Sequence, residues 1–100
     1  MPYEIELAEP VKAQLRHHLT TRSRSIFLTA IKAQLLYEPP VETRNRKRLR
    51  PNPLAPWELR VGDLRVFYEV AEEGAKRVYI LAVGEKRGNS LWIGGEEVSL

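Results

Sequence analysis

The feature that most constrains the fold is the stretch of residues 57–70, where two alternating segments flank a Gly-Asp dipeptide at 62–63. Alternation of apolar and polar side chains on both sides of a two-residue turn is typical of a β-hairpin. Counting outward from the turn places Arg60 opposite Arg65. The sequence therefore predicts a hairpin with two guanidinium groups side by side on one face.

This arginine pair suggests an anion-binding face. Like charges directly opposite each other are unfavourable in a sheet, and the planar donors of a guanidinium group suit phosphate. In the same register Glu58 and Phe67 share the face of Arg60 and Arg65. Two interpretations fit this pattern. In the first, Glu58 and the two arginines act together on a phosphate group. In the second, the face is solvated and Glu58 only forms ion pairs with the two arginines.

The N-terminal third predicts a strand followed by a helical hairpin. Residues 3–7 alternate as a half-buried strand does, and Pro10 suits the first turn of a helix. Hydroxyl side chains at 20–23 supply a turn, and a second helix is expected from about Arg24 to Tyr37, ended by the prolines that follow. Two such amphipathic helices need a sheet to cover their apolar stripe.

Residues 38–56 contain five of the seven prolines and show no hydrophobic period, so they predict a loop or an arm, not a helix. Five positive charges lie within seven residues of it: Arg44, Arg46, Lys47, Arg48 and Arg50. Such a run is commonly a solvated loop. Its position ahead of the hairpin favours contact with a nucleic-acid backbone, which adds affinity without base specificity.

A third strand is expected at 77–84 after a turn at 72–75, and a tail with turn formers follows. Tyr68 and Tyr79 are expected on the core face of the sheet. The element order predicts one α+β domain, residues 1–100, in which the N-terminal strand and the helical hairpin pack on a mainly antiparallel sheet of about four strands.

Composition excludes several chemistries. The chain has no cysteine, which removes disulfides, thiolate metal sites and a thiol nucleophile. His17 and His18 are adjacent, about 100° apart around a helix, and cannot grip one metal ion together; we expect no metal and no cofactor. A net charge of +3 favours an acidic partner such as nucleic acid. Without a signal or membrane-spanning pattern, a soluble, cytoplasmic protein is expected.

Along essentially its whole length the chain resembles the RelE/ParE superfamily of toxins from bacterial type II toxin-antitoxin systems. The strand-helix-helix start, Lys47-Arg48-Leu49, the block at 57–68 and the segment at 80–87 carry this resemblance. In the RelE branch it implies a metal-independent, ribosome-dependent endoribonuclease, in which the RNA 2′-hydroxyl attacks the adjacent phosphate. In the ParE branch it implies a DNA gyrase poison that hydrolyses nothing.

The resemblance implies roles for individual residues. Arg65 corresponds to the arginine that starts the second hairpin strand, Arg60 to the leucine-arginine pair, and Lys86 or Arg87 to the basic residue after the glycine of the third strand. Two places depart from the pattern. The lysines of the first hairpin strand are replaced by Pro56 and Glu58, and Trp92 replaces a C-terminal tyrosine, so it can stack on a base but cannot exchange a phenolic proton.

We therefore expect an mRNA-cleaving toxin, with a gyrase inhibitor or a catalytically degenerate antitoxin-binding member as alternatives. The expected partners are a cognate antitoxin, mRNA and the ribosome with its rRNA. The expected catalytic residues are Arg65, Arg60, Lys86 and Glu58. The expected substrate-binding residues are Arg46, Lys47, Arg48, Arg50, Arg87 and Trp92.

Overall fold

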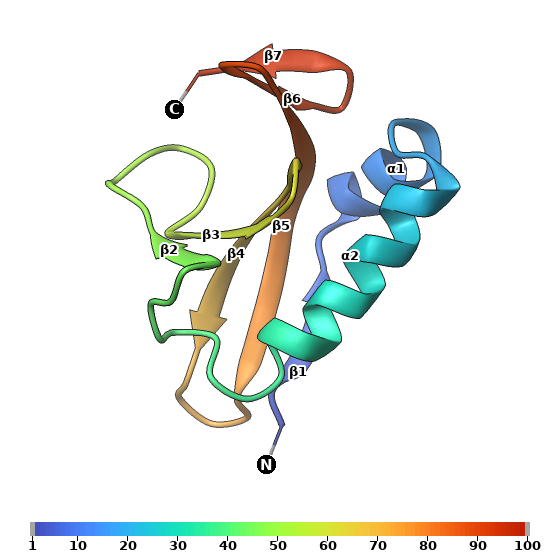
Figure 1. Cartoon of the computed structure of the whole chain (residues 1–100). Helices are drawn as coiled ribbons and strands as arrows, with labels where there is room; N and C mark the ends of the chain where they lie inside the picture. The colour runs from blue at the N-terminus through green and yellow to red at the C-terminus, as the bar shows by residue number, and fades with distance from the viewer. Residues whose placement is uncertain (1, 100) are drawn as a thin grey trace.

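The computed structural model describes residues 2–99, in which two helices lie against one face of a curved sheet (Figure 1). The helices are α1 (Glu9–His17) and α2 (Thr21–Gln34). The strands are β1 (Glu4–Leu7), β2 (Arg46–Arg48), β3 (Trp57–Val61), β4 (Leu64–Ala71), β5 (Arg77–Arg87), β6 (Ser90–Ile93) and β7 (Glu96–Val98). The predicted α+β class is confirmed.

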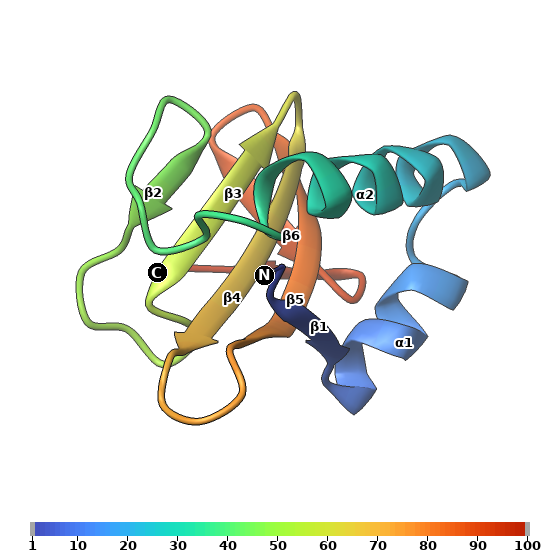
Figure 2. The same ribbon diagram turned by 90° about the horizontal axis from the view of Figure 1, so that it is seen from below.

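The sheet has seven strands, more than the four or so that we expected. Strands β2 to β7 follow one another in the order β2-β3-β4-β5-β6-β7, and every pair in this series is antiparallel. Strand β1 pairs in parallel with the first half of β5 (Figure 2). The additional strands are the three-residue β2 and the C-terminal pair β6 and β7, which are too short for an alternation pattern to reveal.

The predicted hairpin register is confirmed. Strands β3 and β4 pair with Val61 opposite Leu64 and Arg60 opposite Arg65. Gly62 has a φ of +58°, a left-handed conformation that this turn requires and that glycine adopts without steric cost. The tip of the hairpin is therefore fixed by local chemistry.

The helix boundaries differ from the predicted ones by a few residues. Helix α2 begins at Thr21 because the hydroxyl of Thr20 accepts a 3.0 Å hydrogen bond from the Ser23 amide and caps the helix. It ends at Gln34 instead of reaching Tyr37. No described helix is long and apolar enough to cross a membrane.

The main core lies between the helices and the sheet. Residues of α1 and α2 such as Val11, Phe27 and Ile31 are buried against β3, β4 and β5. Tyr68 belongs to this core, as predicted. The prediction for Tyr79 is wrong: it pairs with Glu69 and points away from the core, because its neighbours in β5 take the core positions.

The opposite sheet face carries a second, smaller cluster. Phe67, Ala82 and Leu91 are buried there with Ala55, and the loop of residues 49–56 and the C-terminal hairpin pack over them. This face is therefore only partly open, and the exposed arginine face that the sequence suggests is confined to the hairpin end and its rim.

Candidate functional site

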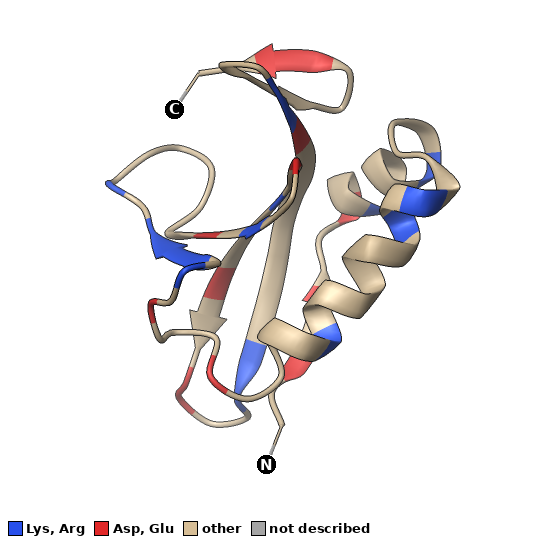
Figure 3. Ribbon diagram, in the orientation of Figure 1, with Lys and Arg blue, Asp and Glu red and all other residues tan. Residues whose placement is uncertain are grey.

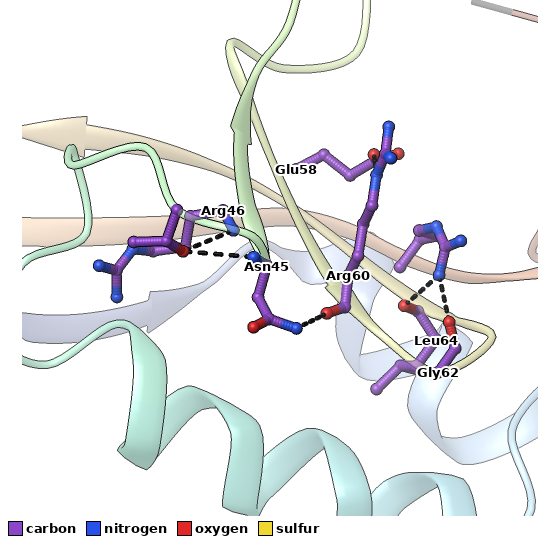
Figure 4. Close-up of polar contacts among 8 residues, drawn as sticks. Asn45, Arg46, Glu58, Arg60, Gly62 and Leu64 are labelled. Carbon is purple, nitrogen blue, oxygen red and sulfur yellow. Dashed lines mark hydrogen bonds and ion pairs between the residues drawn. The ribbon is translucent and has the colours of Figure 1, made fainter.

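The candidate site is built around an ion pair on the sheet face opposite the helices. The Nε atom of Arg60 donates a hydrogen bond of 2.5 Å to Oε1 of Glu58, two residues earlier on β3 (Figure 4). The Glu58 side chain is only 9% exposed, whereas that of Arg60 is about half exposed at 49%. The carboxylate is thus held inside the site while the guanidinium group reaches solvent.

Arg65, directly opposite Arg60, folds back over the hairpin tip. Its Nη1 atom donates to the backbone oxygens of Gly62 at 2.6 Å and Leu64 at 3.0 Å (Figure 4). Within residues 2–99 Arg65 forms no ion pair with a carboxylate. At the hairpin, two guanidinium groups thus stand near the Glu58 carboxylate, and their planar donors suit a phosphate group.

Lys86 shares a hollow of about 330 Å³ with Glu58. The backbone amide of Lys86 donates a 2.7 Å hydrogen bond to the carbonyl of Asp63, which ties the end of β5 to the hairpin tip. Asn89, Ser90 and Glu97 are among the residues that line the rest of the hollow, and the Glu97 carboxylate accepts a 2.9 Å hydrogen bond from the Ser90 hydroxyl. Of the four expected catalytic residues, Glu58 and Lys86 line this hollow. Arg60 contacts Glu58, and Arg65 is paired opposite Arg60.

Sequence reasoning missed Asn89 and Ser90. They follow Arg87-Gly88, and the sequence indicated only that they form a turn. Their place in the hollow depends on β6 folding back along β5, where Ser90 pairs with Arg87.

The basic run is not a free loop, because Arg46–Arg48 form the edge strand β2. Arg46 is only 8% exposed, and its guanidinium group donates to the backbone oxygens of Gln34 at 2.7 Å and Val41 at 2.9 Å. Its donors are used by the fold. We therefore leave Arg46 out of the candidate substrate surface.

The remaining basic residues of the run point in different directions. Lys47 stands opposite Glu58 on the face of the candidate site. Arg48 pairs with Trp57 and its guanidinium carbon lies 5.5 Å from the Trp57 ring centroid, on the helix side of the sheet. Arg50 is exposed in the loop that follows. Strand alternation thus divides one charge run between two faces.

Arg87 and Trp92 lie together but away from the hollow. The guanidinium carbon of Arg87 is 5.5 Å from the Trp92 ring centroid. Consecutive residues of a strand face opposite sides, so Arg87 points away from the face of Lys86. The structure therefore gives two basic surfaces at the end of β5.

No group of three or more His, Cys, Asp or Glu side chains among residues 2–99 could hold a metal ion. The chemistry that the described site can support is that of charged donors and a carboxylate, which can bind a phosphate group and move a proton.

The two-helix layer, the antiparallel sheet and the basic hairpin face define a small toxin of the RelE/ParE superfamily, as the resemblance predicted. Residues 5–89 match the family of the ParE toxin of the type II toxin-antitoxin system, parDE, and the chain belongs to this family.

A solved structure gives the same fold. The crystal structure of the toxin-antitoxin complex RelBE2 from Mycobacterium tuberculosis contains a chain that is 26% identical, with a TM-score of 0.72. The match covers 86% of this chain and 100% of that chain. No curated protein matches the sequence. The chain is thus a type II toxin-antitoxin toxin of the ParE/RelE type.

Proposed function

We propose that this toxin is a metal-independent endoribonuclease that cuts mRNA on the ribosome and so inhibits translation in the cytoplasm. The observation that carries the proposal is the arrangement of three cations near the buried Glu58 carboxylate: Arg60 and Arg65 pair across the hairpin, and Lys86 lines the hollow of Glu58 together with Glu97. Metal-free phosphoryl transfer needs this combination of fixed positive charge and a proton acceptor.

In the proposed reaction the 2′-hydroxyl of the RNA attacks the adjacent phosphorus atom. Glu58 accepts the proton of that hydroxyl, and Arg65 and Arg60 stabilise the charge that develops on the phosphate oxygens. The bond to the 5′-oxygen of the next nucleotide breaks, and Lys86 donates the proton that this leaving oxygen needs. The products are a cyclic 2′,3′-phosphate and a free 5′-hydroxyl.

The Glu58–Arg60 contact gives this proposal a defined first step. A carboxylate that accepts a hydrogen bond from Arg60 is occupied as a base until Arg60 turns to another anion. Arg60 is half exposed and can rotate towards a phosphate group, which frees an oxygen of Glu58. RNA binding would thus prepare the base.

Other cations extend the proposed RNA surface. Lys47 is on the face of the hollow, Arg50 is exposed in the loop after β2, and Arg48 is exposed on the other face of the sheet. Arg87 and Trp92 offer a charged and stacked contact on the other side of the β5 end. Such contacts strengthen binding in a salt-dependent way.

We also propose that a cognate antitoxin binds and neutralises this toxin. The support is the similarity to a toxin that was crystallised in the complex RelBE2 with its antitoxin.

Gyrase inhibition is the second candidate, and the match to the ParE toxin family favours it. In that case the arginine face would bind the gyrase or its DNA and no bond would be cut. The Glu58–Arg60 pair would then have a structural role only.

Controlled expression distinguishes these functions. Translation arrest with cleaved mRNA supports the nuclease, whereas an SOS response with halted replication supports the gyrase inhibitor. Unaffected growth at confirmed expression indicates a degenerate member. Incubation of the purified protein with programmed ribosomes, followed by mapping of mRNA ends, checks cleavage directly, and intact mRNA in that assay would contradict the proposal.

A further inference from the structure

A groove crosses the sheet face opposite the helices, here called the outer face. It consists of two hollows of about 570 and 510 Å³ that share one residue, Leu81. The first hollow is lined by residues of β1, the start of α1 and β5, among them Leu7 and Tyr79. The second lies beside the loop of residues 48–56. No residue of the groove lines the hollow of Glu58, so the two are separate.

A β-bulge turns Leu81 into this groove. Phe67 pairs with Ala82 and Tyr68 pairs with Ile80, so Leu81 has no partner on β4. A bulge of this kind changes the direction of a side chain. Leu81 packs against the small cluster of the outer face and stays partly exposed. The floor of the groove therefore offers an apolar contact to a ligand.

Two carboxylates flank the ring of Tyr79 in the groove. Tyr79 pairs with Glu6 of β1 on one side and with Glu69 of β4 on the other. Neighbouring strands are about 4.8 Å apart, so a cation above the ring is within reach of both carboxylates. Glu6 and Glu69 are exposed, and neither takes part in the three ion pairs formed among residues 2–99. Their charge is therefore available to a ligand.

The charges of the outer face are divided between its two ends. Arg60, Arg65 and Lys86 lie at the end that holds the candidate site, whereas Glu6 and Glu69 lie at the groove. Figure 3 shows acidic positions on β1, on β4 and in the turn after β4. An apolar groove with an acidic border fits an occupant that has apolar side chains beside cationic ones.

The cations of this end are already paired or lie at the far side of the groove. Lys12 contacts Glu9 at 2.9 Å, and Arg77 contacts Glu4 at 3.4 Å and approaches the Tyr79 hydroxyl. The basic residues of the loop, Arg48 and Arg50, line only the second hollow. The hollow beside Tyr79 thus keeps an acidic character.

We propose that this groove binds a cationic segment of a partner protein. An arginine or lysine side chain of the partner lies over the Tyr79 ring, between Glu6 and Glu69. An adjacent apolar side chain of the partner contacts Leu81. RNA is a poor occupant, because the two carboxylates repel its phosphates. A second copy of the chain is also a poor one, because its cationic run Arg46–Arg48 is already paired with β3 in its own sheet.

The position of the groove suggests what docking does for the toxin. The groove and the hollow of Glu58 share a face of the sheet but no residue. The chain can therefore hold RNA at one end of this face and a basic protein at the other, and a particle made of both offers the two contacts at once. This consequence rests on the proposed function, whereas the docking itself does not.

The test titrates the full chain with a synthetic peptide in which arginine alternates with valine, and two-dimensional NMR follows the backbone amides. Binding should be salt-dependent and should shift the amide signals of Tyr79 and Leu81. The same peptide with glutamate in place of arginine should not bind. Spermidine, a cation without apolar side chains, should bind more weakly than the arginine peptide.

The variant Glu6→Gln with Glu69→Gln should bind the arginine peptide at least about fivefold more weakly, because both carboxylates lose their charge. The matched control is Glu38→Gln with Glu42→Gln, since these residues are exposed in the loop after α2 and do not line the groove. It removes the same charge and should change the affinity less than about twofold. Both variants should keep the circular dichroism spectrum of the wild type.

Four results would each overturn the proposal: no binding of the arginine peptide, signal shifts outside the groove only, equal losses in the two double variants, or spermidine binding as tight as that of the peptide. The readout is peptide affinity, so it is separate from the cleavage assay. A chain that binds the peptide in the groove but leaves mRNA intact would keep this proposal and contradict the nuclease function.

Discussion

The guanidinium group of Arg46 closes the C-terminal end of α2, where its Nη1 atom donates a 2.7 Å hydrogen bond to the carbonyl of Gln34. Its Nε atom donates to the Val41 carbonyl at 2.9 Å. One side chain of the basic run therefore connects the helical layer, the loop after it and the edge strand β2. Its positive charge also suits the negative end of the helix dipole.

We expect Arg46→Ala to lower the free energy of unfolding by about 3 kcal/mol, because it leaves two partly buried carbonyl groups without a donor. Urea denaturation measures this change. Arg44→Ala is the control, since Arg44 is exposed, and should change the stability by less than about 0.5 kcal/mol. Equal stability of the two variants would show that the Arg46 contacts contribute little.

Arg65→Ala should abolish toxicity and leave the fold nearly unchanged. Arg65 lies on the polar face of the hairpin, and its protein contacts are two carbonyl groups of the turn. Arg60→Ala should reduce toxicity less. Growth after induction at matched protein levels, with thermal unfolding as the stability control, tests both variants. If the Arg65→Ala variant still arrests growth, this face is not the active site.

Glu58→Gln should slow mRNA cleavage on purified ribosomes by at least about a hundredfold, the lower end expected for loss of a general base. Glutamine keeps the shape but cannot accept the proton. Because the substitution also removes the ion pair with Arg60, the thermal stability of the variant must be measured alongside. Cleavage at the wild-type rate would leave Glu58 as a structural partner of Arg60.

Lys47 and Arg50 should contribute to RNA affinity through phosphate contacts. Their joint replacement by Ser is expected to reduce the slope of log affinity against log salt by about 1.4, because each contact to single-stranded RNA contributes roughly 0.7. Replacement of Arg16 and Arg22 by Ser removes the same charge from the helical layer and serves as the control. An equal slope in both double variants would indicate an effect of net charge only.

Tyr68 should make stability depend on alkaline pH. Its hydroxyl donates a 2.8 Å hydrogen bond to the Pro39 carbonyl, and burial raises the pKa of its phenol well above 10.0. Above pH 10 the unfolded chain loses this proton while the folded chain keeps it, so stability falls as pH rises. Tyr68→Phe should cost about 1 kcal/mol at pH 8 and show a weaker fall between pH 9 and about 11. Parallel pH profiles of the wild type and Tyr68→Phe would contradict this prediction. Tyr3 contributes equally to the pH dependence of both proteins, so it does not affect the comparison.

Much of the fold could be predicted because its signals are local. Hairpin register follows from a two-residue turn, and the opposition of Arg60 and Arg65 needs only counting from Gly62. Strand β2 could not be predicted in this way. Its three residues are all cationic and it exists because β3 offers a partner, so pairing decides it and propensity does not.

The candidate site was partly predictable for the same reason. Glu58 and Arg60 are two residues apart on one strand, a spacing that places them on one face. The sequence could not show that Arg46 is buried or that Arg87 and Trp92 lie away from Lys86. It could not show the covered face around Phe67 either, because that cover comes from the loop at 49–56 and the C-terminal hairpin.

The sequence by itself determined the hairpin, the helical pair, the α+β class and the superfamily, since these depend on turn chemistry, periodicity and a motif along the chain. Only the tertiary structure decided which cations are free to bind a ligand. A guanidinium group is available when its donors lack protein partners, and that depends on residues distant in the chain. Arg46 meets Gln34 across twelve residues, whereas Arg65 meets only its own turn.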